Sequence, residues 1–203
     1  MWAVAAPRAL VWFLTAHYLR VFSPLTRIRL LMVSIGFRVS PSRVTFALVK
    51  GTPHDGFTLV NASAVLIPPA LETARQLQFV RTTLLDVMDE YAVSRAGLRI
   101  SEAIARRNPF RLNLEGVVQE LLASSQAELY VTGPIATIAS LLGERDRTTI
   151  KRLISGEAVP SYALHWKDLS EEQRESVLVA VAACHASPTS AKAVGLANSG
   201  LSA

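Results

Sequence analysis

Runs of apolar and β-branched residues in the first third of the chain predict three strands. They cover residues 30–39, 43–49 and 57–67. A Ser-Pro-Ser turn separates the first two strands, and a glycine- and proline-containing turn separates the second from the third. Because both connections are short, the three strands are expected to pair as an antiparallel meander.

Beyond the prolines at positions 68 and 69, helical spacing of apolar residues alternates with further strand patterns. Helices are predicted from about residue 70, over residues 112–123, over residues 146–154, and from residue 171 to about 186. Strands are predicted at 98–105 and 128–132, with a further apolar segment at 135–142. Gly97 marks the exit of the first helix, Asn108 followed by Pro109 begins the second, and Ser170 caps the last.

The predicted order is β-β-β-α-β-α-β-α-α. The meander implies antiparallel pairing, and the later strand–helix–strand steps imply parallel pairing. This order favours an α/β domain with the mixed five-stranded sheet of the ribonuclease H fold, flanked by helices. We expect that domain to cover residues 32–186 and to be followed by a disordered tail of small residues, 187–203.

Residues 1–31 form an N-terminal apolar extension that contains no membrane span, because its apolar run, residues 9–19, falls short of the roughly 20 residues that a span needs. Two interpretations stay open: translation that begins natively at Met32, and a short amphipathic helix. The only cysteine, Cys184, excludes an internal disulfide and favours a reducing compartment, the cytoplasm. Its apolar surroundings favour a buried structural thiol.

Three short segments resemble the RuvC-type Holliday junction resolvases, a branch of the ribonuclease H superfamily. They are LRISE, which ends at Glu102, the basic segment DRTTIKRLI at 146–154, and ESVLVAVAACH at 175–185. The likeness covers roughly residues 30–186. It implies a metal-dependent nuclease that acts on branched or structured DNA.

The resemblance also implies a magnesium site. Nucleases of this fold gather acids from strand one, the end of strand four and the last helix around Mg²⁺, which prefers hard oxygen ligands. Glu102, Glu172 and Glu175 are the candidate catalytic and metal-binding residues, and the spacing of the last two places them on one helix face. The alternatives without a catalytic role are that Glu102 is a solvated acid at a strand end, and that Glu172 and Glu175 are ordinary acids at a helix N-terminus.

One departure weakens this interpretation. The family carries an aspartate in strand one, and we assign the corresponding position here to Gly36, in VSIGFRV. No acid occurs anywhere among the first 50 residues. The predicted acidic centre is therefore incomplete, and whether the chain is an enzyme stays open.

The net charge of +5 and the basic segments are compatible with nucleic acid as the partner, DNA above all. The candidate phosphate contacts are Arg106, Arg107, Arg147, Lys151 and Arg152, with Arg111 beside them. The alternative is a solvated charged face. We also allow for a homodimer.

Three functions fit this pattern: a divergent Mg²⁺-dependent nuclease, a nucleic-acid-binding protein that keeps the fold without catalysis, and a domain that binds other proteins. Gly36 motivates the second, and the apolar N-terminal extension motivates the third.

Overall fold

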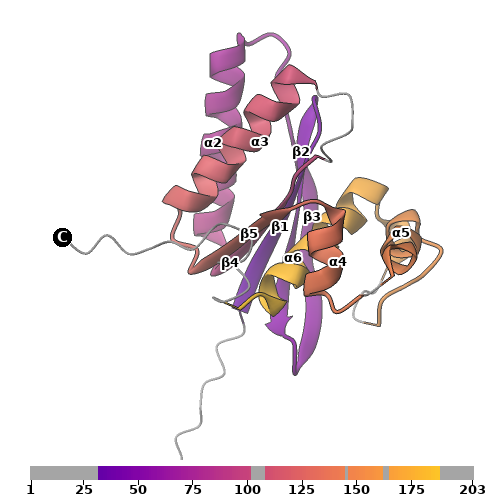
Figure 1. Cartoon of the computed structure of the whole chain (residues 1–203). Coiled ribbons are helices and arrows are strands. Elements are labelled where there is room, and N and C mark those ends of the chain that lie inside the picture. The colour runs from indigo at the N-terminus through magenta and orange to yellow at the C-terminus, as the bar shows by residue number, and fades with distance from the viewer. Residues whose placement is uncertain (1–31, 102–107, 145, 162–164, 188–203) are drawn as a thin grey trace, which may run out of the picture. The chain divides into compact units, whose positions relative to one another are not determined.

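A five-stranded sheet forms the centre of the computed structural model, which describes residues 32–101, 108–144, 146–161 and 165–187 (Figure 1). The strand order is β3-β2-β1-β4-β5. The strands are β1 (Met32–Val39), β2 (Arg43–Thr52), β3 (Gly56–Leu66), β4 (Arg95–Arg99) and β5 (Leu129–Gly133). β1, β2 and β3 pair antiparallel, whereas β4 pairs parallel with both β1 and β5. The predicted ribonuclease H-like sheet is therefore confirmed.

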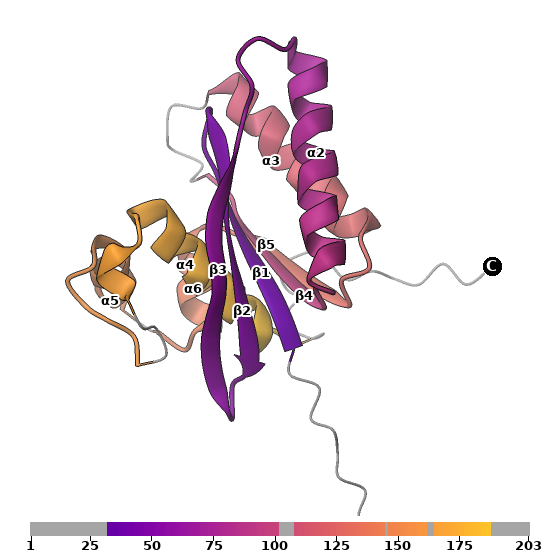
Figure 2. The same cartoon turned by 180° about the vertical axis from the view of Figure 1, so that it is seen from behind.

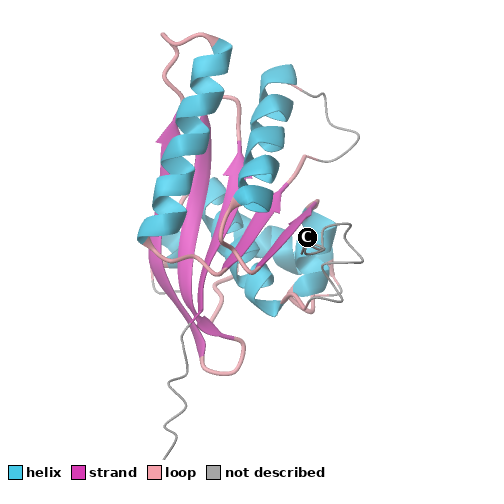
Figure 3. Cartoon of the chain, turned by 90° about the vertical axis from the view of Figure 1, so that its left-hand side faces the viewer, coloured by secondary structure: helices cyan, strands magenta, loops and turns pink. Residues whose placement is uncertain are grey.

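Helices cover both faces of the sheet (Figures 2 and 3). α2 (Thr73–Glu90) and α3 (Pro109–Ser124) lie on one face, and α4 (Ile135–Leu141), α5 (Arg147–Ser155) and α6 (Glu171–His185) lie on the other. Two helix starts follow the sequence signals, because Asn108 accepts a hydrogen bond from the Arg111 amide and Ser170 forms a capping box with Gln173. α4 is one helix more than the predicted order contains.

The prediction for the fourth strand is wrong in its bounds. β4 spans Arg95–Arg99 and begins three residues before the predicted 98–105. Helix α2 ends at Glu90, and Ala92 then takes a left-handed φ of 48°, so the chain leaves the helix well before Gly97. Gly97 lies inside β4 for a different reason, which is the close passage of α6.

Helix α6 crosses the sheet at two glycines that pair with each other, Gly36 on β1 and Gly97 on β4. A Cβ on Gly36 would lie 2.1 Å from the carbonyl oxygen of Ser176, and one on Gly97 would lie 2.7 Å from a methyl of Val179. Ser34 Oγ also donates to the carbonyl oxygen of Ala180 at 2.9 Å. The helix therefore packs directly on strand backbone.

The buried guanidinium of Arg174 holds α5 against α6. It donates to the carbonyl oxygens of Trp166 at 3.1 Å and Ile154 at 2.6 Å. The Trp166 indole N–H in turn donates to the Leu153 carbonyl at 2.9 Å. The bonds to Leu153 and Ile154 satisfy carbonyl groups at the end of α5, where no further helical donors follow.

Cys184 is buried at the end of α6, as predicted, and burial raises the pKa of its thiol. A raised pKa leaves little thiolate at neutral pH, which agrees with a structural role. Within the described part of the chain, the helices are too short or too polar to cross a membrane.

The glycine crossing yields a stability prediction. Gly36→Ala should lower the free energy of unfolding by about 3 kcal/mol, the upper end for an overpacked core, because the new methyl meets backbone atoms of α6. Gly116→Ala in α3 is the matched control, since nothing lies within 4 Å of its Cβ position. There alanine should stabilise the helix by up to about 1 kcal/mol. Equal effects of the two variants in chemical denaturation would contradict the close packing.

Candidate functional site

Two arginines lie where strands β1 and β4 approach their carboxyl ends. Arg38 and Arg99 are paired residues of the two parallel strands. Each comes two residues after a glycine that faces α6, and side chains two apart on a strand share a face. Both arginines are therefore directed to the α6 side of the sheet.

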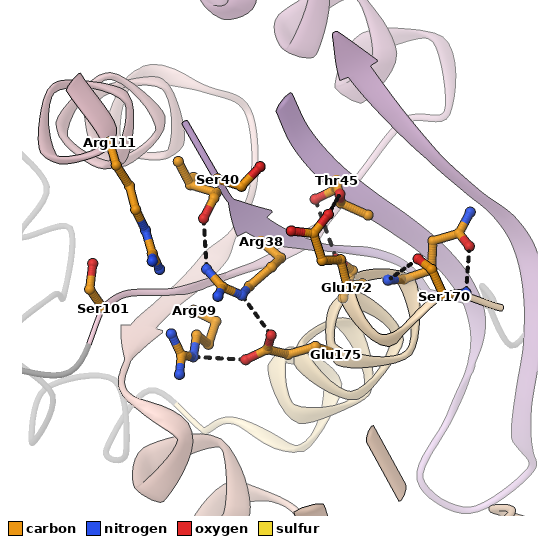
Figure 4. Close-up of polar contacts among 12 residues, drawn as sticks. Arg38, Ser40, Thr45, Arg99, Ser101, Arg111, Ser170, Glu172 and Glu175 are labelled. Atoms are coloured by element: carbon orange, nitrogen blue, oxygen red, sulfur yellow. Dashed lines mark hydrogen bonds and ion pairs between the residues drawn. The ribbon is translucent and has the colours of Figure 1, made fainter. Parts of the chain in front are cut away.

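Glu175 of α6 joins the two arginines (Figure 4). Its Oε2 lies 2.6 Å from Arg38 Nε and its Oε1 lies 2.7 Å from Arg99 Nε. The three side chains are only 16%, 14% and 10% exposed for Arg38, Arg99 and Glu175. We refer to these three residues as the Arg–Glu–Arg centre. It links β1, β4 and α6 by charge at a place where water screens little.

Contrary to the assignment made from the sequence, Gly36 is not the strand-one position whose side chain can reach the acids of α6. Gly36 lies against the backbone of Ser176 and Ala180, where no side chain fits. Arg38 is the β1 residue whose side chain reaches the acid on α6. The chain therefore does more than lack the aspartate of the family at this strand end: it has a positively charged side chain there.

Glu172 lies one turn before Glu175 and faces β2. Thr45 Oγ1 lies 3.3 Å from Glu172 Oε2, and Arg43 Nε lies 3.9 Å from the same oxygen. Its side chain is 35% exposed. The two glutamates therefore both face the sheet, as their spacing suggested, but they contact different strands.

Glu102, the third candidate ligand, lies outside the described residues, as do Arg106 and Arg107.

The described residues do not fit the predicted magnesium site. Each carboxylate oxygen of Glu175 already lies against a guanidinium. Arg38 and Arg99 place two positive charges where Mg²⁺ requires oxygen ligands. Across the described ranges, no group of three or more His, Cys, Asp or Glu side chains could hold a metal ion.

A third arginine, Arg111 in the first turn of α3, reaches toward the same end of the sheet (Figure 4). Its Nε donates to Glu115 Oε1 at 3.0 Å. The same oxygen accepts from Ser101 Oγ at 2.5 Å, and Ser101 follows β4 directly beyond Arg99 and Ile100. The Nη2 atom of Arg111 is buried and has no hydrogen-bond partner among the described residues.

The basic residues predicted on the later helix lie on α5. Arg147, Lys151 and Arg152 are all exposed, and Arg152 Nε lies 3.8 Å from Glu157 Oε2. Such exposed cations are available to an anionic partner. Sequence reasoning overlooked Arg38 and Arg99, although a signal was present: IGFR and AGLR repeat a glycine and an arginine at the same spacing in two strands.

The Arg–Glu–Arg centre yields a second stability prediction. Glu175→Gln should lower the free energy of unfolding by about 3 kcal/mol, because it removes the carboxylate that two buried guanidinium groups contact. Glu172→Gln is the control and should cost less than about 1 kcal/mol, since its ion pair is long and partly exposed.

Replacing all three residues of the centre by apolar residues of similar volume should recover most of the stability, since the three charges are removed together. Chemical denaturation measures each variant. If Glu175→Gln is as stable as Glu172→Gln, the centre does not hold the fold together.

Comparisons with known proteins place this geometry in a known fold. No family model and no curated protein matches the sequence. Two solved structures of Thermus thermophilus RuvC, one in complex with a Holliday junction substrate, align over 81% of this chain and 97% of theirs, with TM-scores of 0.55 and 0.54 and 11% identity. The yeast mitochondrial Holliday junction resolvase aligns over 77% of this chain and 81% of its own, with a TM-score of 0.49 and 12% identity. The two RuvC structures show that the chain has the ribonuclease H-like fold of the RuvC-type resolvases.

Proposed function

We propose that this chain is a nucleic-acid-binding protein that uses a resolvase fold without cleaving its ligand. The observation that carries the proposal is the Arg–Glu–Arg centre. The resemblance to resolvases implies an acid at the end of strand one, where this chain has Arg38, and Arg99 stands beside it on β4.

Arginine cannot replace the chemistry that a metal supplies. In two-metal hydrolysis the ions activate the attacking water and stabilise the leaving oxygen. A guanidinium stays protonated at any physiological pH, so it neither accepts a proton from water nor coordinates it as a Lewis acid. It does bind phosphate oxygens well, through paired N–H donors.

The charge of the chain supports an anionic partner. The net charge is +5, and the exposed cations of α5 lie on the same side of the sheet as the Arg–Glu–Arg centre. The structure of Thermus thermophilus RuvC with a Holliday junction shows the same fold on branched DNA, which makes a four-way junction the first ligand to test. The cytoplasm stays our prediction for its location and rests on the single buried cysteine.

The competing function is a divergent nuclease that uses Glu102 together with Glu172 or Glu175. It requires a metal ion to enter beside two arginines. The two proposals differ in what magnesium does, which is directly measurable.

The first test compares binding and cleavage. The full chain should bind a four-way junction equally in Mg²⁺ and in EDTA at matched ionic strength, and it should cut neither the junction nor linear duplex DNA. Affinity should fall steeply as salt rises, because phosphate contacts release counterions. Gel-shift and product assays across Mg²⁺ and Mn²⁺ measure both. Metal-dependent products would restore the nuclease hypothesis, and salt-insensitive or absent binding would refute ours.

The second test concerns α5. Replacing Lys151 and Arg152 by glutamine should weaken junction binding and reduce the slope of log affinity against log salt by about two, about one for each phosphate that is no longer neutralised. The matched control replaces Arg75 and Arg81 by glutamine. These lie on α2, on the opposite face of the sheet, and removing them changes the net charge equally (Figure 2). If both pairs change the slope equally, binding depends on net charge alone and not on α5.

A further inference from the structure

We propose that Arg38, Arg99 and Arg111 form a receptor for one phosphate of a nucleic-acid backbone, at the place where nucleases of this fold hold metal ions. The site binds that phosphate through guanidinium groups and needs no divalent cation. This inference rests on the proposed function and names the chemistry of its central contact. We call the three residues the arginine receptor.

The three arginines come from three elements that meet at one end of the sheet. Arg38 and Arg99 are paired on adjacent strands, about 4.8 Å apart in the hydrogen-bonding direction. Arg111 is tied to the same end because its partner Glu115 also accepts from Ser101, two residues beyond Arg99. In Figure 4 the guanidinium groups of all three extend into the region between α3 and the strand ends.

The receptor retains hydrogen-bonding capacity after its internal contacts are made. A guanidinium has five N–H donors. Arg38 uses Nε on Glu175 and one Nη1 donor on the Val39 carbonyl, so its Nη2 donors bond to no described residue. Arg111 uses Nε on Glu115, and its buried Nη2 also bonds to none. The buried Nη2 of Arg111 lacks an acceptor, which is unfavourable, and a phosphate oxygen would supply one.

The three guanidinium groups of the receptor are partly shielded from water, which strengthens their attraction for an anion. The carboxylate of Glu175 lies against Arg38 and Arg99, and that of Glu115 lies against Arg111. The arginine side chains are 14–20% exposed, which shields their charges from bulk water but leaves an edge of each accessible.

This arrangement selects phosphate over a bare cation or a neutral group. The forked, planar guanidinium matches two oxygens of a phosphate at once, and several forks can hold a tetrahedral group from different sides. A divalent metal would instead be repelled by the same three cations. The residues that this chain has at the place where nucleases of the fold hold metal ions therefore support phosphodiester recognition.

Arginine-to-lysine variants test the receptor. Arg38→Lys, Arg99→Lys and Arg111→Lys each keep the charge opposite Glu175 or Glu115 but replace a fork of donors by a single ammonium. Each should weaken four-way-junction binding in EDTA about tenfold, as the removal of a bidentate charged interaction implies. Arg81→Lys, in an exposed ion pair with Glu120 on the other face, should change it less than about twofold.

A second measurement uses the wild-type chain, so that it stands even if a variant fails to fold. The Nε–H resonances of the three arginines, followed by NMR, should shift on addition of a short oligonucleotide without divalent metal. Inorganic phosphate should shift them only at far higher concentration, which distinguishes a backbone phosphate from the free ion. Chemical denaturation of each lysine variant confirms that it is folded before its affinity is interpreted.

The outcomes separate the two proposals. If the wild-type chain binds the junction and all three folded lysine variants bind it equally well, the receptor is refuted while nucleic-acid binding stands. If the oligonucleotide shifts other arginines but not these three, the receptor is refuted as well. If the wild-type chain binds no nucleic acid, the proposed function is refuted, and the receptor is refuted with it.

Discussion

The close packing of α6 on the strand pair β1 and β4 determines the rest of the structure. Gly36 and Gly97 are partners across the sheet, and the helix rests on the flat place that they form. Ser34 anchors the helix by bonding to one of its carbonyls, and Ser176 does so from the helix to the Thr45 carbonyl. Because side chains alternate along a strand, the next residue on the same face of each strand must point at the preceding turn of α6. The position of Glu175 between two arginines follows from that geometry.

Much of the fold could be predicted from local pattern. The meander, the alternation of strands and helices, and the starts of α3 and α6 all depend on short-range signals, namely apolar period, turn residues and helix caps. The bounds of β4 could not be predicted in the same way. Gly97 is a helix-exit signal by composition, and its true role depends on a helix more than 70 residues later in the chain. Long-range packing overrides local propensity at such positions.

The candidate site was predicted only in part, and for a related reason. Glu172 and Glu175 were placed correctly on one face of the last helix, but their partners come from strands far away in sequence. Metal sites are recognised in a sequence by acidic residues, so Arg38 and Arg99 were not considered. Each nevertheless follows a glycine at the same spacing. The register that makes them neighbours exists only once β1 and β4 pair in parallel.

The Arg–Glu–Arg centre has an evolutionary consequence. Replacing either arginine by an acid would set two carboxylates beside one cation, and replacing Glu175 alone would leave two cations together. Each single substitution is expected to lower the free energy of unfolding by several times the thermal energy. The three positions are therefore epistatic, and we expect them to change together in related sequences. An acidic centre and a basic one are thus separate solutions on the same backbone, and single substitutions between them would pass through less stable intermediates.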